Sequence, residues 1–314
     1  MAHLWLSVAA ILLSDSHIDL KTGFYGSIFL FFIVLCKVMF SIQVNDLCDQ
    51  KEDTTAGKKR WIFYVPKSLG IAITMAWAAA GFAIIILTRG SVPVILSYAT
   101  TILFGLFYSL PPVRFKERGI WGLIVYALAA TIIYVLVPWA WFESSLVLLI
   151  FLLFTVFTDK WVQLHFHQVV DYQADLKNET QTYAVKKGPE QTRKTLRIAS
   201  SSASFSMVGL LGYIIFFTQQ EALLKMILGA SVISVVAASG IYIRMAKKKS
   251  KHVSELIREL PWTYLGLTYL VFSVLPPVGF VCLAMKESLM WIIAALSSLS
   301  LLGISLHSLK YKYS

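Results

Sequence analysis

Long apolar stretches, separated by short polar loops, follow one another along almost the whole chain. A helix needs about 20 apolar residues to cross a bilayer, and many of the stretches approach that length. Apolar and polar residues do not alternate as in membrane barrel strands, so each span must be a helix with internally satisfied backbone groups. The sequence predicts an all-helical membrane protein with ten spans, the first one short: 2–14, 24–46, 62–87, 92–110, 119–137, 144–172, 195–217, 222–243, 262–284 and 288–307.

The composition supports a membrane protein over a soluble one. Hydrophobic residues make up 57% of the chain and charged residues only 14%. Stretches such as 69–87, 120–137 and 195–217 contain no acidic residue, which the buried core of a soluble protein explains poorly. No region is polar enough to form a separate soluble domain. We therefore expect residues 1–314 to form a single transmembrane domain.

Basic residues gather in the loops that follow the even-numbered spans. The opposite loops hold little more than Lys21, Arg89 and Lys286. By the positive-inside rule, the basic loops face the cytoplasm. The net charge of +11 then follows mostly from topology, and no nucleic-acid partner is needed to explain it. The basic loops contain Lys51, Lys58, Lys59, Arg60, Arg114, Lys116, Arg118, Lys177, Lys186, Lys187, Arg193, Lys194, Lys247, Lys248, Lys249, Lys251 and Arg258.

Two acidic clusters lie where apolar spans run into these basic loops. Carboxylates three, four or seven residues apart project from one face of a helix, so each cluster can gather several oxygens. Such oxygens suit Mg²⁺, which is usually held by one or two carboxylates while it also binds substrate phosphates. The sequence predicts two halves of one magnesium and diphosphate site. The first half is Asn45, Asp46, Asp49 and Asp53, and the second is Asp171 and Asp175, with Glu179 beyond.

Polar residues also run in stripes inside the second and sixth spans. Ionisable groups at membrane depth are costly and usually face the interior of a bundle, so two such stripes predict a cavity between two helices. For Gln163 or His167 alone, a hydrogen bond to a neighbouring helix is an equally good explanation. The first stripe is Lys37, Ser41, Asn45 and Asp49. The second is Asp159, Gln163, His167, Asp171, Asp175 and Glu179, with His165, Gln168 and Tyr172 alongside.

The segment from Tyr108 to Lys116, with the sequence YSLPPVRFK, ends the fourth span. Its two prolines cannot continue a helix and favour an extended turn. The basic residues that follow, with those after each acidic cluster, would meet the phosphate oxygens that a metal ion leaves exposed. For Arg114, anchoring at the membrane surface is an equally good explanation.

Taken together, these motifs resemble the UbiA superfamily of intramembrane prenyltransferases. NDLCDQKED, YSLPPVRFK, and DYQAD followed by KNETQTYAVKKG occur in the order and at the approximate spacing of that family, over about residues 24–190. The resemblance implies a helical bundle of nine spans around an enclosed cavity, so nine and ten spans both stay open. It also implies that Arg114 and nearby lysines help to bind an isoprenyl diphosphate. Its implied ligands for Mg²⁺ are Asn45, Asp46, Asp49, Asp53, Asp171 and Asp175.

The reaction implied by the resemblance is transfer of an isoprenyl group to a lipophilic, aromatic acceptor. Metal ions and basic residues would stabilise the departing diphosphate, and a dry cavity with aromatic walls would protect the allylic carbocation. We expect a catalytic set of Asp49, Asp171, Asp175 and Lys37. The expected substrate-binding set is Asn45, Lys58, Lys59, Arg60, Tyr108, Arg114, Lys116, His167, Gln168, Tyr172 and Lys186.

The first 59 residues contain neither arginine nor proline, unlike family members that prenylate aromatic acids, and this leaves the acceptor open. A carboxylate-bearing acceptor would need a basic partner, and Lys37 is the one deep candidate in the first half of the sequence. A second possibility is a UbiA-type terpene cyclase, which needs no acceptor. A transporter that binds divalent ions is a third, but it would predict paired halves, and the sequence shows no clear internal repeat apart from the acidic motifs.

Overall fold

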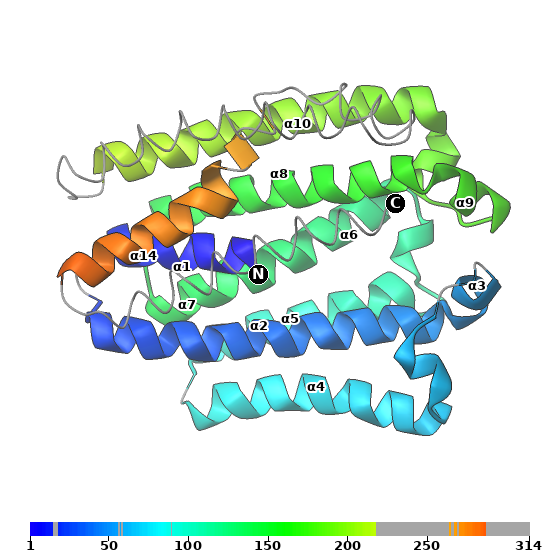
Figure 1. The fold of residues 1–314 in the computed structure, drawn as a ribbon, viewed down its shortest axis with the longest axis horizontal. Coiled ribbons are helices and arrows are strands. Elements are labelled where there is room, and N and C mark those ends of the chain that lie inside the picture. Colours follow the sequence, from blue (N-terminus) through cyan, green and yellow to red (C-terminus); the bar gives the residue numbers. More distant parts are fainter. Residues whose placement is uncertain are drawn as a thin grey trace.

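The structure is a computed structural model that describes residues 1–14, 18–55, 57, 59–88, 90–217, 264, 267, 268 and 270–286. The described residues form helices joined by loops, and the long helices lie side by side in one bundle (Figure 1). The predicted all-helical membrane bundle is confirmed. Among the described residues, six helical segments are long and apolar enough to cross a bilayer: Lys21–Cys48, Lys67–Leu87, Val92–Ser109, Ile120–Phe142, Leu146–Val170 and Tyr183–Ile215.

The elements follow the sequence pattern closely. In chain order they are α1 (Ala2–Ser14), α2 (Leu20–Cys48), α3 (Gln50–Thr55), the 3₁₀ turn η1 (Trp61–Tyr64), α4 (Lys67–Leu87), α5 (Val92–Ser109), the 3₁₀ turn η2 (Phe115–Glu117), α6 (Ile120–Thr131), the π-helical η3 (Ile132–Leu136), α7 (Val137–Phe142), α8 (Leu146–Val170), α9 (Tyr172–Lys177), α10 (Tyr183–Phe217), the π-helical η4 (Leu270–Val274) and α14 (Leu275–Lys286).

Three predicted boundaries are wrong, each for a local reason. The span expected at 62–87 begins as α4 at Lys67, because Pro66 separates it from η1. The span expected at 119–137 continues to Phe142 through η3 and α7, where Pro138 lies in the first turn of α7 and is tolerated. The span expected at 195–217 begins at Tyr183 as α10, which is kinked at Gly188 before Pro189. The expected spans 222–243 and 288–307 lie outside the described residues, as do residues 262, 263, 265, 266 and 269 of the span expected at 262–284, so the number of spans stays a prediction.

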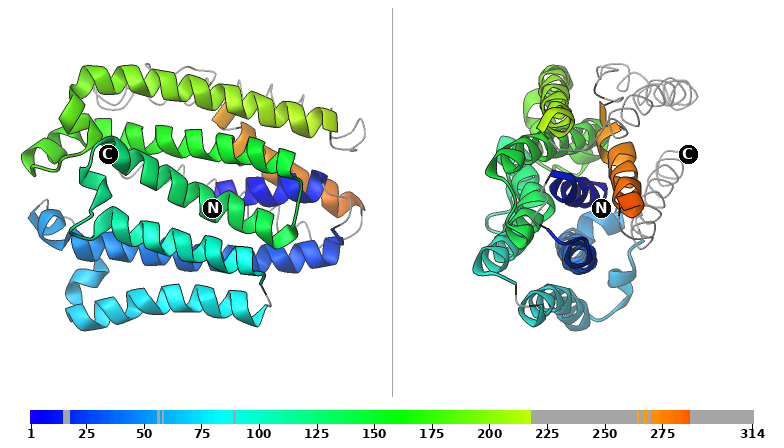
Figure 2. Two further views of the ribbon diagram at one scale, coloured as in Figure 1. Left: turned by 180° about the vertical axis from the view of Figure 1, so that it is seen from behind. Right: turned by 90° about the vertical axis from the view of Figure 1, so that its left-hand side faces the viewer.

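The first helix, α1, lies in the middle of the bundle (Figure 2). Every residue from His3 to Leu13 is buried. It contacts α14 most extensively, and also α2, α7, α8, α10, η3 and η4. At a rise of about 1.5 Å per residue, its 13 residues make a helix that is too short to cross a bilayer. The prediction that the first element is short is confirmed.

The motif-bearing segments all lie at one end of the bundle. The helices α2, α5 and α8 end there, and α3 and α9 follow at the right of Figure 1. Around them, α2 packs against α4 and α5, while α8 packs against α6 and α10. An isolated parallel bridge joins Gly119, before α6, to Thr182, before α10. The fold therefore brings together the ends of helices that are far apart in the sequence.

Candidate active site

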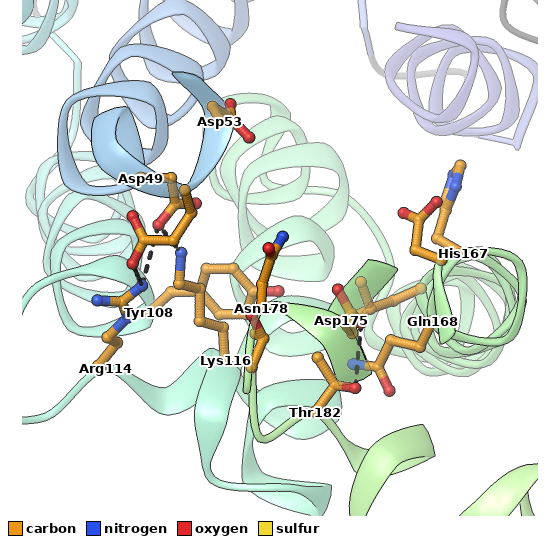
Figure 3. Close-up of a pocket in the computed structure, with 14 residues that line it drawn as sticks. Asp49, Asp53, Tyr108, Arg114, Lys116, His167, Gln168, Asp175, Asn178 and Thr182 are labelled. Atoms are coloured by element: carbon orange, nitrogen blue, oxygen red, sulfur yellow. Dashed lines mark hydrogen bonds and ion pairs between the residues drawn. The ribbon is translucent and has the colours of Figure 1, made fainter. Parts of the chain in front are cut away.

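A pocket of about 230 Å³ lies at this end of the bundle, between the two acidic clusters (Figure 3). The end of α2 and α3 form one side, and the end of α8 and α9 form the other. Of the residues predicted from sequence, it is lined by Asp49, Asp53, Tyr108, Arg114, Lys116, His167, Gln168, Asp171 and Asp175. Sequence analysis did not single out Glu52, Leu164, Asn178, Thr180 and Thr182, which also line it.

Two basic residues approach Asp49 from the loop after α5. A guanidinium nitrogen of Arg114, Nη2, lies 3.2 Å from Asp49 Oδ1 and 3.2 Å from Glu52 Oε1. The ammonium of Lys116 also forms an ion pair with Asp49 Oδ1. On its other edge, Arg114 Nε lies 2.8 Å from Glu117 Oε1. Arg114 therefore bridges three carboxylates and links the loop after α5 to the end of α2.

These contacts affect the ionisation of Glu52, which lies in the short helix α3, outside the membrane spans. Partial burial alone would raise the pKa of its carboxyl. A backbone hydrogen bond and the hydrogen bond from Arg114 outweigh burial, and the pKa lies below its ordinary value. Glu52 therefore stays ionised and available to hold Arg114 under ordinary conditions.

The backbone of Arg114 is strained. Its φ of 38° places it in the left-handed region, which residues other than glycine rarely adopt. Such conformations cost on the order of 1–3 kcal/mol and persist where surrounding contacts enforce them. Here the ion pairs to Asp49, Glu52 and Glu117 are such contacts. The strain supports a specific role for this side chain beyond that of a membrane anchor.

A different basic residue, Arg60, lies close to the other two carboxylates of the first cluster. Arg60 Nε lies 3.7 Å from Asp46 Oδ1 and 3.7 Å from Asp53 Oδ2, and both carboxylates are largely buried. The neighbouring Asn45 accepts a hydrogen bond of 3.2 Å from Ser109 Oγ at the end of α5. The first cluster is therefore divided between two groups of basic residues.

The second cluster is fixed through its backbone and through Thr182. Asp175 accepts a hydrogen bond of 3.2 Å from Thr182 Oγ1, and the same hydroxyl accepts a longer bond of 3.4 Å from the Val185 N–H in the first turn of α10. Asp171 directly follows α8, and its N–H bonds to His167 O at 2.8 Å. The carboxylate of Asp175 is therefore positioned by the start of the next helix.

The remaining predicted site residues lie elsewhere. Asn45, Asp46 and Arg60 lie beside the pocket but do not line it, and Tyr172 is half-buried outside it. Lys186 donates a hydrogen bond of 3.0 Å to the backbone carbonyl of Glu117, and so contacts the loop after α5. The other predicted residues are Lys59, which is exposed, Lys37, which is buried deep in α2, and Lys58, which lies outside the described residues.

The carboxylates fit a Mg²⁺ ion that is shared with a substrate. Within the described residues, no three His, Cys, Asp or Glu side chains are grouped closely enough to hold a metal ion alone. Mg²⁺ does not require such a group, since one or two carboxylates usually hold it together with water and substrate phosphates. The pocket offers carboxylates from both sides and basic residues between them. This donor set suits a metal ion that arrives with a diphosphate.

A comparison with protein families agrees with this geometry. The model of the UbiA prenyltransferase family matches residues 3–256. The chain belongs to this family. The resemblance inferred from the three sequence motifs is thus confirmed, and the protein is an integral membrane member of the UbiA family.

Solved structures of UbiA homologues have the same fold. A UbiA homologue from Archaeoglobus fulgidus bound to DMAPP and Mg²⁺ is 17% identical, with a TM-score of 0.57, and the match covers 87% of this chain and 94% of that one. An apo UbiA homologue from Aeropyrum pernix K1 is 14% identical, with a TM-score of 0.55, over 90% and 96% of the two chains. A digeranylgeranylglyceryl phosphate synthase is 13% identical, with a TM-score of 0.55, over 94% and 93%. No curated protein matches the sequence significantly.

Sequence signals existed for two pocket residues that the analysis missed. Glu52 lies within the first acidic motif, three residues after Asp49. Residues three apart lie on the same face of a helix. Thr182 precedes the helix α10, where a hydroxyl often caps a helix. Neither signal indicates that the residue faces a pocket, because this depends on how the loops pack together.

Proposed function

We propose that this UbiA protein is a Mg²⁺-dependent intramembrane prenyltransferase that transfers an isoprenyl group from an isoprenyl diphosphate to a lipophilic aromatic acceptor. The observation that carries the proposal is the pocket that both acidic clusters line together with Arg114 and Lys116. It is supported by the homologues from Archaeoglobus fulgidus, solved with DMAPP and Mg²⁺ and with GPP and Mg²⁺. We also propose that the whole chain forms one domain for this reaction.

The acidic residues of both clusters would hold the metal. When bound, Mg²⁺ supplies positive charge that offsets the charge growing on a departing diphosphate. The ligands we propose are Asp49, Asp53, Asp171 and Asp175 on the pocket wall, with Asn45 and Asp46 beside them.

The basic residues would change partners when substrate binds. Arg114 and Lys116 pair with Asp49 in this structure. A diphosphate in the pocket offers them an alternative anionic partner, and charge-assisted bonds to its oxygens strengthen as negative charge accumulates there. Because both side chains already face the pocket, little rearrangement is needed to reach it.

The reaction balances as an electrophilic substitution. The allylic C–O bond breaks, and diphosphate leaves with the bonding electrons. A ring carbon of the acceptor forms a bond to the allylic carbon, and the proton on that ring carbon then leaves to restore aromaticity. The carbocation needs protection from water, and aromatic faces stabilise positive charge. The rings of Tyr108 and Tyr126, whose centroids are 6.1 Å apart, would line its path below the pocket.

We further propose that the pocket opens toward the cytoplasm. The loops at its end of the bundle are rich in basic residues, and loops of this kind face the cytoplasm in most membrane proteins. Arg60, Arg114, Lys116, Arg118 and Lys186 all lie there. At the opposite end, the described charged residues are mainly Asp19 and Glu143, beside the helix ends, and Lys21 in the first turn of α2.

The test is to incubate the purified protein in detergent with Mg²⁺ and farnesyl or geranylgeranyl diphosphate, with and without aromatic acceptors. Release of diphosphate that requires the acceptor, with a matching mass gain on the acceptor, would support a prenyltransferase. Loss of release with EDTA and recovery with Mg²⁺ would support the metal.

Two other results would contradict the proposal. Release without any acceptor, with a cyclic hydrocarbon or alcohol as product, would make the protein a terpene cyclase. No release with any chain length or acceptor would contradict both enzymes and favour a transporter of divalent ions.

A further inference from the structure

A second pocket, of about 530 Å³, lies at the same end of the bundle as the active-site pocket and has no lining residue in common with it. It is formed where α3 and the start of α4 meet the end of α2 (Figure 1). A Cβ atom added at Gly70 would lie 3.4 Å from Leu47 Cδ2, so the first turn of α4 packs directly on α2 here. The second pocket is lined by Leu47, Cys48, Gln50, Lys51, Thr54 and Lys67.

The short helix α3 separates the two pockets. Glu52 and Asp53 line the active-site pocket, whereas Lys51 and Thr54 line the second one. Residues three apart lie on the same face of a helix, and Lys51 and Thr54 have this spacing. The second pocket therefore lies on a different face of α3 from the carboxylates, and a ligand bound there would not compete with the diphosphate.

The charged residues of the second pocket are both basic. Lys51 and Lys67 line it, and no acidic residue does so within the part of the chain that the structure describes. The ammonium of Lys67 takes part in none of the ion pairs between described residues. Gln50 adds a side-chain amide that can donate hydrogen bonds. Two ammonium groups and an amide suit the oxygens of a phosphate group.

The second pocket lies at the edge of the bilayer. The span of α2 ends at Cys48, and the span of α4 begins at Lys67. One and two turns after Lys67, on the same face of α4, the side chains of Ile71 and Met75 are 46% and 52% exposed. Exposed apolar side chains within a membrane span contact lipid acyl chains. A basic pocket that continues into an apolar stripe thus fits a ligand with a phosphate group and an acyl chain.

We propose that the second pocket binds an anionic phospholipid, with its phosphate between Lys51 and Lys67 and an acyl chain along Ile71 and Met75. The inference goes beyond the proposed function, because this lipid takes no part in the reaction. Anionic lipids are concentrated in the cytoplasmic leaflet, which is the side proposed for this end of the bundle. The bound lipid would connect α3 to α4 and so stabilise α3, which among the described elements packs mainly on the end of α2.

The test measures lipid binding to the full-length protein. The purified protein in detergent is titrated with phosphatidylglycerol or with phosphatidylcholine, and bound lipid is measured by native mass spectrometry. We expect phosphatidylglycerol to bind more tightly and to raise the midpoint of thermal unfolding. Lys51→Gln combined with Lys67→Gln should weaken the tightest binding of phosphatidylglycerol roughly 25-fold, because each lysine near an anionic lipid contributes a factor of about five. Lys51→Arg combined with Lys67→Arg should retain it.

The matched control is Lys177→Gln combined with Lys187→Gln. These lysines are exposed on α9 and α10, at the same end of the bundle, and line neither pocket. The control removes the same charge and should bind phosphatidylglycerol as the wild type does. Lys67→Gln alone should weaken binding about fivefold, and it provides the same test if the double variant does not fold.

Three results would overturn the inference. Unchanged binding in the Lys51 and Lys67 variants would mean that the lipid binds elsewhere. Equal losses in these variants and in the control would mean that lipid is attracted by the basic surface in general. Inorganic phosphate and glycerol 1-phosphate are the soluble probes, and if either raises the unfolding midpoint as much as phosphatidylglycerol, the ligand is a soluble phosphate. None of these measurements needs diphosphate release, so their outcome is independent of the proposed function.

Discussion

The guanidinium of Arg114 lies 3.2 Å from a carboxylate oxygen of Asp49, which is 65 residues earlier in the chain. The two side chains are 21% and 13% exposed, so water screens this ion pair less than a pair on the open surface. The contact connects the loop after α5 with the end of α2 at the wall of the pocket. It therefore couples the position of a basic residue to the position of a proposed metal ligand.

Replacing Asp49 by Asn tests the first acidic cluster. The amide keeps the shape of the side chain but removes the charge that a metal ion, Arg114 and Lys116 would share. We expect diphosphate release at saturating substrate to fall by a factor on the order of 10². Asp19→Asn, at the opposite end of the bundle, is the matched control and should keep full activity. Retention of more than half the activity in Asp49→Asn would refute this assignment.

Glu117 lies outside both acidic motifs and does not line the pocket. It positions Arg114 through an ion pair with the guanidinium Nε. Glu117→Gln should let the guanidinium move, because a partly exposed ion pair of this kind contributes up to about 1 kcal/mol. We expect KM for the isoprenyl diphosphate to rise roughly two- to fivefold, with kcat within about twofold of wild type. Steady-state kinetics at several diphosphate concentrations would measure the difference. Glu190→Gln, exposed on α10, is the control, and an unchanged KM in Glu117→Gln would argue against a positioning role.

The sequence was informative about helices and about the acidic ends of α2 and α8. Apolar spans are long enough to be recognised individually, and the prolines after Leu110 end α5 at the predicted place. The start of α10 could not be recognised, because its first turns are polar and lie before the apolar stretch. Polar helices that extend beyond a membrane give no hydropathy signal.

The sequence could not predict which basic residue pairs with which carboxylate. Nothing in the spacing indicates that Arg60 faces Asp46 and Asp53 while Arg114 and Lys116 face Asp49. These partners depend on the packing of three loops against one another, and loop packing is a tertiary property. In the same way, the polar stripe on α8 predicted that Asp159 faces the interior, but its contact with His3 required the placement of α1.

The ionisation of Glu52 predicts a limited pH dependence of stability. Its pKa in the folded protein lies below the ordinary value of 4.5, so its contacts stabilise the fold above that value, and the contribution is lost as the pH falls through the folded pKa. The side chain is 36% exposed, which limits the contribution to less than about 1 kcal/mol. The difference in unfolding temperature between wild type and Glu52→Gln should therefore be constant from about pH 6 to 7 and shrink toward about pH 3. A difference that grows at low pH would contradict this account.

Gly81 on α4 tests the packing of α4 against α5. A Cβ atom at this position would lie 1.9 Å from the hydroxyl oxygen of Tyr98 and 2.3 Å from its ring carbon Cζ. Tyr98 is fully buried and its ring packs edge-on against Phe82, so the rigid ring cannot swing aside without moving α5. Gly81→Ala should therefore lower stability by about 1–3 kcal/mol, as overpacking usually does. Thermal unfolding in detergent would show this as a lower midpoint.

The matched control is Gly212→Ala on α10, where an added Cβ meets no atom within 4 Å. Alanine favours a helix over glycine by roughly 1 kcal/mol, so this variant should unfold at the same temperature as wild type or slightly higher. Because the two substitutions are chemically identical, a difference between them isolates the contact with Tyr98. Equal midpoints for the two variants would mean that the helices separate easily, and that α4 contributes little to holding α2 and α5 in place below the pocket.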